Sequence, residues 1–194
     1  MLFDTDHENI KWSEYDCLGL KVQQDSGEWF NIKDYREPAK LSKDVPQRKG
    51  VIFFIHGYGK AMKYLAILAR NLAAAGYDVM GIDWRGMGSS EGERGYIESA
   101  DVLQSDQWCM ILEACKKYKI NQQTEPIYLM GYSMGALVAS HMMNSVIGRS
   151  LLSGVLMVAP FFRDYDNKVA NVYKFTLPMS YIHPRFSISS RGKV

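Results

Sequence analysis

The pentapeptide Gly131-Tyr132-Ser133-Met134-Gly135 places a serine between two glycines, an arrangement in which the hydroxyl can act as a nucleophile. The apolar run before it, Ile127–Met130, predicts a buried strand. After it, Ala136–Ile147 contains no Pro or Gly and predicts a packed helix. Strand, sharp turn and helix are the context that a nucleophile elbow requires, and the two glycines allow the close backbone approach of such a turn. The alternative is a serine in an ordinary glycine-containing loop, so the surrounding chain must decide.

A serine hydroxyl is a poor nucleophile at neutral pH, so it needs a base for its proton and donors for the oxyanion that forms. Met134 follows Ser133 at the start of the predicted helix, and its backbone N–H is the first expected donor. The second should come from the loop after an earlier strand, where His56-Gly57-Tyr58-Gly59 stands, and we expect the Tyr58 N–H to supply it. Because His56 lies beside these donors, we interpret it as a loop-positioning residue rather than the catalytic base.

Two further apolar runs predict the strands that carry the other functional loops. Val51–Ile55 is a continuous run of strand formers, as expected of a central strand buried on both faces, and it ends at His56. Val79–Ile82 ends at Asp83, which opens a long loop extending to Gly92. From Val51 on, such strands alternate with helical segments, and this alternation predicts right-handed crossovers and a parallel sheet.

The segments between these strands have helical periodicity. Tyr64–Ala75 is a predicted helix with Gly76 as its left-handed cap. Ser99 is the predicted N-cap of a second helix, whose last turn is basic, as suits a helix C-terminus. Each helix has an apolar stripe, formed by Leu65, Leu68 and Leu72 in the first and by Trp108, Ile111, Leu112 and Cys115 in the second.

The two ends of the chain differ in character from this alternating part. Cys17–Gln24 and Trp29–Tyr35 flank a turn-like Asp-Ser-Gly and predict a β-hairpin. Leu156–Ala159 predicts a further strand, ended by Pro160. Residues 161–194 contain many aromatic and aliphatic residues without strand alternation, which is typical of a helical or irregular apolar flap.

The composition is that of a globular protein and argues against several functional classes. The chain has 194 residues, of which 47% are hydrophobic and 23% charged, and its formal net charge of +2 favours neither nucleic acid nor an anionic membrane as partner. Three cysteines without metal-ligand spacing predict a reduced compartment, and no motif indicates a metal or cofactor. We find no signal peptide and no membrane-spanning run. We therefore predict an intracellular protein, with the cytoplasm as default and an organelle left open.

Three motifs in order give the chain a resemblance to the α/β-hydrolase superfamily, and within it to the monoacylglycerol lipase and lysophospholipase branch of serine-aminopeptidase-like hydrolases. They are His56–Gly59, the string from Asp83 to Arg94 that contains Ser-Glu-Gly-Glu-Arg, and Gly131–Gly135. Each stands at the carboxyl end of a predicted strand. The resemblance covers roughly residues 50–164, with a weaker match to the N-terminal hairpin.

The resemblance implies a division of roles. Ser133 would be the nucleophile, Tyr58 and Met134 would form the oxyanion hole, and Asp83 would brace a loop rather than serve as the catalytic acid. Residues 1–160 would form the N-terminal part of the hydrolase core and residues 161–194 the start of a cap. The expected substrates are lipid-like esters with an acyl chain.

The catalytic acid and histidine are expected after two later strands of this fold, beyond the cap. The chain continues only about sixty residues past Ser133. His141 lies eight residues along the elbow helix, roughly 12 Å up its axis, too far to reach the hydroxyl. His183 falls in the flap, and Asp164 and Asp166 fit solvated loop charges better than a catalytic acid. We therefore expect acid and base to come from another chain or from a continuation.

A sheet that lacks its last two strands would leave Leu156–Ala159 as an apolar edge, which predicts a protein partner that covers it or completes the fold.

The sequence leaves two functions from different classes open. The first is a serine ester hydrolase acting through an acyl-enzyme on Ser133. The second is an inactive hydrolase-fold subunit of a larger assembly, because oxyanion hole and binding alone accelerate hydrolysis only about 10³–10⁴-fold. Lipid binding without cleavage is a third, minor alternative.

Overall fold

The computed structural model describes residue 12 and residues 17–23, 27 and 29–160. The chain divides into two units, residues 1–160 and residues 161–194, and all described residues belong to the first. The predicted cap segment, with Asp164, Asp166 and His183, lies outside the described residues, so its assignment stays a prediction. No helix in the described part of the chain combines the length and apolar character needed to span a bilayer.

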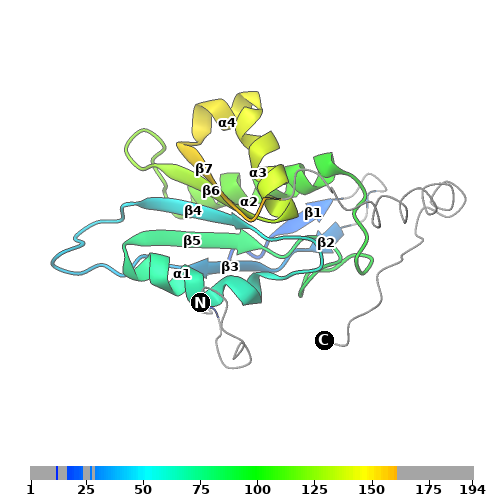
Figure 1. The fold of residues 1–194 in the computed structure, drawn as a ribbon, viewed down its shortest axis with the longest axis horizontal. Helices are drawn as coiled ribbons and strands as arrows, with labels where there is room; N and C mark the ends of the chain where they lie inside the picture. Colours follow the sequence, from blue (N-terminus) through cyan, green and yellow to red (C-terminus); the bar gives the residue numbers. More distant parts are fainter. Residues whose placement is uncertain (1–11, 13–16, 24–26, 28, 161–194) are drawn as a thin grey trace, which may run out of the picture. The chain divides into compact units, whose positions relative to one another are not determined.

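The described part of the chain is built on a five-stranded sheet in the order β3-β5-β4-β6-β7 (Figure 1). β5, β4, β6 and β7 are parallel, whereas β3 pairs with β5 antiparallel, so the predicted mostly parallel sheet is confirmed. The strand bounds are Asp34–Glu37 for β3, Gly50–Ile55 for β4, Tyr77–Ile82 for β5, Ile127–Tyr132 for β6 and Gly154–Val158 for β7.

The register of the sheet brings the loops of all three motifs to one edge. Ile55, the last residue of β4, pairs with Gly131 of β6, and Phe54 pairs with Gly81 of β5. The loops that follow these strands therefore leave the sheet side by side. β4 lies at the centre with every residue buried, as predicted for a strand covered on both faces.

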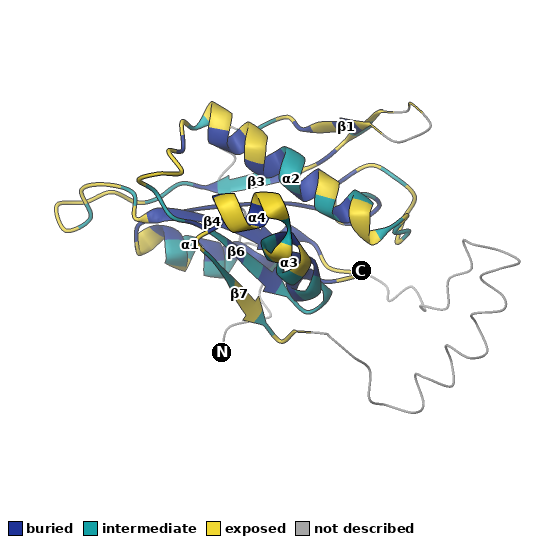
Figure 2. Cartoon of the chain, turned by 90° about the horizontal axis from the view of Figure 1, so that it is seen from above, coloured by how far each residue is buried: buried dark blue, intermediate teal, exposed yellow. Residues whose placement is uncertain are grey.

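Helices cover both faces of the sheet. Side chains of β4 alternate between two apolar clusters, because successive residues of a strand point to opposite faces. Phe53 and Ile55 pack in the cluster that includes residues of α2 and α3, whereas Ile52 and Phe54 pack in the cluster that includes residues of α1. In Figure 2, α1 and α2 each have both buried and exposed residues, as expected of helices that cover a sheet. The helix bounds are Met62–Leu65 for the 3₁₀ turn η2, Ala66–Ala74 for α1, Ala100–Lys117 for α2, Met134–Asn144 for α3 and Val146–Leu151 for α4.

The N-terminal hairpin forms, but its second arm is shorter than predicted. β1 (Lys21–Gln23) pairs antiparallel with β2 (Trp29–Asn31), and the chain then leaves the hairpin. The remaining residues of the predicted arm enter β3 of the main sheet. The physical reason is that Asp34–Glu37 find a backbone partner in β5, and the buried Asp34 carboxylate there accepts hydrogen bonds from the Leu18 and Gly19 N–H groups (2.5 and 3.2 Å).

The predicted elbow helix breaks in two. α3 ends at Asn144 and Ser145 is extended, with its hydroxyl donating to the Met142 carbonyl (2.6 Å) and accepting from the Gly148 N–H (3.0 Å). Ser145 thus ends α3 and caps α4. No Pro or Gly stands at the break itself, and a serine in a helix interior and a capping serine look alike in sequence. The glycine that the break needs is Gly148, three residues on, where a methyl group would collide with the Met142 carbonyl oxygen.

The helix caps are confirmed, but the apolar stripes shift. Gly76 has a φ of +100° after α1, and the Ser99 hydroxyl accepts from the Val102 N–H at the start of α2. Leu65 is buried, whereas Leu68 and Leu72 are half-buried, because the small Ala66, Ala69 and Ala73 face the sheet instead. On α2, Leu112 is exposed to 48%, so its predicted place in the buried stripe is wrong.

Candidate active site

Ser133 lies at the turn between β6 and α3 in a backbone conformation that non-glycine residues rarely adopt. Its φ is +54° and its ψ is −120°. Such a conformation costs about 1–3 kcal/mol and persists only when the surrounding structure enforces it. Here the Ser133 N–H donates to the Val158 carbonyl of β7 (2.9 Å), and the Ser133 carbonyl accepts from the Ala136 N–H (3.0 Å). The serine is therefore held in the strained strand-to-helix turn that is typical of a nucleophile.

The two glycines of the pentapeptide are required by packing. A methyl group on Gly135 would collide with the Ile55 and His56 carbonyl oxygens at the end of β4. A methyl group on Gly131 would collide with the Gly135 carbonyl oxygen and the Ala136 Cα. Only glycine at both positions lets α3 start this close to β4 and β6, and this close approach sets the position of Ser133 relative to the sheet.

The loop after β4 lies directly against the serine. A methyl group on Gly57 would lie 3.1 Å from the Ser133 Cβ and 3.2 Å from the Tyr132 carbonyl oxygen. Within the described residues, the backbone N–H groups of Tyr58 and Met134 donate no hydrogen bond. Tyr58 and Met134 therefore stay the predicted oxyanion donors.

His56 is buried and uses both ring nitrogens to hold loops. Its Nε2 accepts from the Trp84 N–H (3.0 Å), so its Nδ1 carries the proton and donates to the Gly57 carbonyl (2.8 Å). Burial lowers the pKa of His56, although the Gly57 carbonyl and the Asp83 carboxylate oppose this effect. A histidine engaged in this way has no nitrogen left for the serine proton, which supports a positioning role.

Asp83 is fully buried and acts as an acceptor for three segments of the chain. Its carboxylate accepts from the Met62 N–H (2.7 Å), the Tyr35 hydroxyl (2.8 Å) and the Ser89 N–H (2.8 Å). Burial is the main reason why the pKa of Tyr35 is raised, and the Asp83 charge adds to it. Asp83 therefore braces the loop after β5 and has no role at the serine that its contacts would support.

The structure also shows contacts around the site that sequence reasoning missed. Tyr58 is 46% exposed, and its hydroxyl donates to the Gly95 carbonyl (2.9 Å), which ties the loop after β4 to the loop after β5. Arg85 donates two hydrogen bonds to the Asp106 carboxylate of α2 (2.7 and 2.8 Å). Burial raises the pKa of Asp106, and Arg85 opposes that shift. The residues lie 21 positions apart, and no sequence pattern connects them.

The charged residues of the Ser-Glu-Gly-Glu-Arg string form hydrogen bonds that shape the loop after β5. Glu91 accepts from the Asn31 backbone N–H (2.7 Å) and side-chain amide (2.9 Å), which lowers the pKa of the Glu91 carboxyl and joins the loop to β2. Arg94 donates to the Ser90 and Gly88 carbonyls (3.2 and 2.9 Å). These hydrogen bonds therefore fold the loop back on itself and hold the segment that contains Gly95, to which the Tyr58 hydroxyl binds.

No histidine among the described residues serves Ser133 as a base. The described part of the chain contains His56, whose ring nitrogens are occupied, and His141, which lies on α3 facing a pocket between α2 and α3. Neither forms a hydrogen bond with Ser133, and the Ser133 hydroxyl has no hydrogen-bond partner within residues 12, 17–23, 27 and 29–160. His183 lies outside them.

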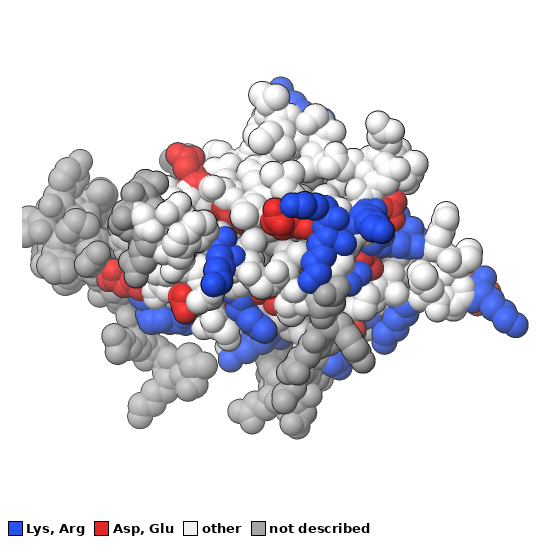
Figure 3. All heavy atoms as spheres, turned by 180° about the vertical axis from the view of Figure 1, so that it is seen from behind, with Lys and Arg blue, Asp and Glu red and all other residues white. Residues whose placement is uncertain are grey.

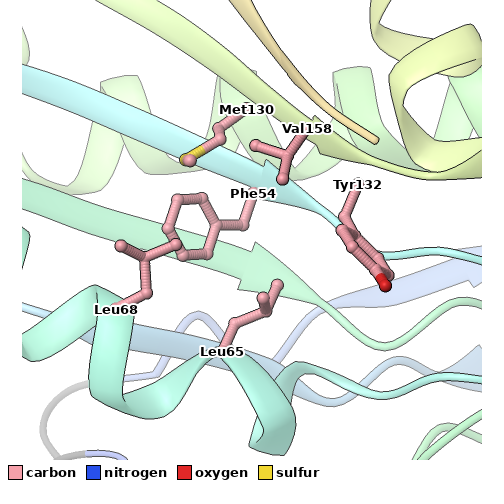
Figure 4. A pocket seen from close by; sticks show the side chains of 6 residues that line it. All are labelled: Phe54, Leu65, Leu68, Met130, Tyr132 and Val158. Carbon is pink, nitrogen blue, oxygen red and sulfur yellow. The ribbon is translucent and has the colours of Figure 1, made fainter. Parts of the chain in front are cut away.

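An apolar groove adjoins the nucleophile on the α1 face of the sheet. Figure 4 shows Leu65 and Leu68 facing strand side chains across it. Its wall includes Tyr132, which precedes the serine, and Val158, whose carbonyl binds the serine N–H. On the face shown in Figure 3, Lys and Arg lie among Asp and Glu. The groove beside Ser133, by contrast, is lined by apolar and aromatic residues.

Comparison with known proteins identifies relatives of one kind. A family model described as serine aminopeptidase, S33, matches residues 46–193. A monoglyceride lipase homolog of Monkeypox virus is 24% identical over 131 residues, which are 68% of this chain and 45% of that protein. The lysophosphatidylserine lipase ABHD12 of Danio rerio is 28% identical over 167 residues, covering 84% of this chain and 38% of that protein. The chain spans less than half the length of these curated relatives.

Solved structures share the fold. A soluble variant of monoglyceride lipase from Saccharomyces cerevisiae, bound to a substrate analog, superposes with a TM-score of 0.72 at 18% identity over 93% of this chain and 56% of that one. A monoacylglycerol lipase of Paleococcus ferrophilus gives a TM-score of 0.64 at 20% identity over 84% and 56%. At these identities the likeness concerns the fold alone.

Proposed function

The chain belongs to the serine aminopeptidase S33 family of α/β-hydrolases, and on that premise we propose that it is a serine ester hydrolase whose nucleophile is Ser133. The observation that carries the proposal is the strained conformation of Ser133 at a strand-to-helix turn whose two glycines are required by packing. Backbone strain of this kind clusters at active sites. The predicted oxyanion donors, the Tyr58 and Met134 N–H groups, have no hydrogen-bond acceptor among the described residues.

In the proposed reaction, the Ser133 Oγ attacks the ester carbonyl carbon while a base takes its proton. The Tyr58 and Met134 N–H groups bind the oxyanion of the tetrahedral intermediate. The ester C–O bond then breaks, the leaving alcohol takes the proton from the base, and an acyl-enzyme remains on Ser133. Water attacks the acyl-enzyme with the help of the same base, which releases the carboxylic acid and restores the serine.

The base and its acidic partner are placed outside the described residues. His56 and His141 are both unsuited, the first by its hydrogen bonds and the second by its position along α3. We therefore assign the histidine and the acid to a continuation of the chain or to a partner polypeptide. The 161–194 segment takes the role of a cap in this proposal.

The proposed substrates are monoacylglycerol-like or lysophospholipid esters. The printed names of the relatives, a monoglyceride lipase homolog and a lysophosphatidylserine lipase, support this class. Apolar pockets lined by Tyr132 on one side of the serine and by Met134 on the other support a substrate with a hydrocarbon part.

A second candidate function is that of an inactive subunit in a larger assembly, and the β7 edge favours it. β7 is the last strand of the sheet within the described residues, with Leu156 and Met157 exposed to 44% and 48%. An exposed apolar edge strand is a template for pairing. In this alternative a partner protein covers β7 and the serine is a remnant.

Hydrolysis separates these functions. Purified native protein is incubated with a monoacylglycerol and a lysophospholipid, and released fatty acid is measured for the wild type, Ser133→Ala and Ser140→Ala. Ser140 lies on the same helix, about two turns beyond the nucleophile, and serves as the matched control. Hydrolysis that is lost only in Ser133→Ala supports the enzyme. Equal background rates in all three proteins support the inactive subunit.

A further inference from the structure

A second apolar cavity lies between α2 and α3, on the face of the sheet opposite the α1 groove. On α3, the residues at positions i, i+3, i+4 and i+7 from Met134 face the start of α2, and the two helices leave a gap there. The gap contains about 470 Å³ of empty space, its open side included, compared with about 250 Å³ for the α1 groove. Its walls include Ala100, Leu103, Met134, Leu137, Val138 and His141.

The chemistry of the walls selects for hydrocarbon. None of the residues that line the cavity is Lys, Arg, Asp or Glu. The amide of Gln104, one of its two polar residues, already donates to the Ala100 carbonyl (3.3 Å). The other is the exposed His141, at the end of the stripe. A polar ligand would lose its hydrogen bonds to water without replacement, whereas an aliphatic chain would not.

The position of the cavity connects it to the nucleophile. Met134 follows Ser133 and lines the cavity with its side chain, while its N–H is the proposed oxyanion donor. Both helices start at the carboxyl edge of the sheet, where ligands of open α/β sheets bind. From Met134 to His141 the α3 stripe extends about 10 Å along the helix axis. A chain that enters beside Ser133 can therefore follow α3 away from the reacting carbonyl.

We propose that the cavity between α2 and α3 binds the acyl chain of the ester that Ser133 cleaves. This inference rests on the proposed function, because an acyl chain is its expected ligand only if the site acts on acyl esters. Each methylene that enters the cavity should raise affinity about fourfold, equivalent to about 0.8 kcal/mol. The gain should stop when the cavity is full.

Fatty-acid binding tests the proposal without requiring catalysis. A fluorescent fatty acid, 11-(dansylamino)undecanoic acid, is displaced from the native protein by saturated fatty acids of increasing length below their micellar concentrations. The expected result is an affinity that rises with each methylene and then levels off. Ser133→Ala should bind as the wild type does, because the serine hydroxyl is not part of the cavity wall.

Two variants fill the cavity from opposite sides. Leu137→Trp does so from α3, and Ala100→Trp does so from the exposed first turn of α2, where a larger side chain does not disturb the core. Each should weaken binding of long chains more than tenfold. Leu112→Trp, exposed elsewhere on α2, is the matched control and should bind normally.

Three results would overturn the inference: no binding of any fatty acid, unchanged binding in both filled variants, or loss of binding in Leu68→Trp, which fills the α1 groove instead. Failure of the proposed function is a separate outcome. If fatty-acid binding depends on chain length but Ser133 catalyses no hydrolysis, the proposed enzyme is wrong and the cavity remains a lipid-binding site. If Ser133 catalyses hydrolysis at a rate that neither filled variant changes, the enzyme is supported and the acyl-chain site is wrong.

Discussion

Tyr58 combines two roles at the scale of a single residue. Its backbone N–H is a predicted oxyanion donor and has no hydrogen-bond acceptor among the described residues, and its exposed side chain is tied to Gly95 by one hydrogen bond of 2.9 Å. The loop that receives this bond is itself cross-linked by Arg94 and Glu91. The side chain therefore anchors its own backbone to a rigid neighbour, as a preorganised oxyanion donor requires.

Replacing Tyr58 by Phe should lower kcat about tenfold and leave KM nearly unchanged, because a loosened donor costs transition-state rather than ground-state binding. The free energy of unfolding should fall by only about 1 kcal/mol, since the lost hydrogen bond is solvent-exposed. Steady-state kinetics and urea unfolding measure the two effects. Tyr96→Phe, in the same neighbouring loop, is the control. An unchanged kcat in Tyr58→Phe would show that the tether does not position the donor.

His56 makes stability depend on pH. Because burial lowers its pKa, the folded protein keeps the ring neutral below about pH 6.5, where the unfolded chain takes up a proton. The stabilisation that depends on neutral His56 is thus fully present above pH 6.5 and is lost as pH falls toward the lowered pKa, by at most about 1.4 kcal/mol per pH unit.

Urea unfolding of the wild type and His56→Asn at pH 7.5, 6.5 and 5.5 measures this contribution. The stability advantage of the wild type over the variant should shrink as the pH falls. A difference that stays constant across the three pH values would mean that His56 is not held neutral by the fold.

The individual partners around Ser133 show where sequence reasoning ends at this scale. The place of Ser133 at a strand-to-helix turn could be predicted because a local pattern marks it, whereas the catalytic roles of Ser133, Tyr58 and Met134 stay predictions. The Arg85–Asp106 pair could not be predicted, because only the tertiary structure decides that Arg85 turns toward α2 rather than toward solvent. Both residues are ordinary in their own segments.

At the scale of elements, the buried Arg85–Asp106 pair joins the loop after β5 to α2. Asp106→Ala should lower the free energy of unfolding by about 1.5–3 kcal/mol, because it removes two charge-assisted hydrogen bonds and leaves the partly buried Arg85 with only the more distant Glu98 carboxylate (4.0 Å) and Gln23 carbonyl (3.4 Å). Asp101→Ala, in the exposed first turn of the same helix, should cost less than about 1 kcal/mol. Denaturant unfolding compares the two. Equal costs would show that the ion pair does not hold the loop.

The strands and most helices could be predicted from the sequence, because the buried side of each element requires apolar residues at a regular spacing. β4 is buried at every position and α2 begins at its predicted cap, as the residue types require. The break at Ser145 and the exposure of Leu112 were missed for a common reason. Periodicity gives the type of an element, whereas its ends and its rotation depend on which side chains fit against the neighbouring sheet.

At the scale of the whole molecule, the outer edge of β7 carries the prediction of a partner. Leu156 and Met157 are exposed on this strand. A charge in an edge strand opposes strand pairing. We therefore expect Leu156→Lys to shift the native protein toward a smaller species in sedimentation velocity, with little change in secondary structure. Val146→Lys, which removes an exposed apolar side chain on α4, is the control. A wild type that is already a monomer would contradict the predicted partner.

If Ser133 is an activated nucleophile, it should react with a fluorophosphonate. The most direct measurement is labelling of the native protein by this reagent, followed by mass spectrometry of its peptides. We expect one modified residue, Ser133, and no labelling of Ser133→Ala. If the reagent fails to modify the native protein while peptide mapping shows Ser133 intact and accessible, the serine is not activated and the proposed hydrolase is wrong.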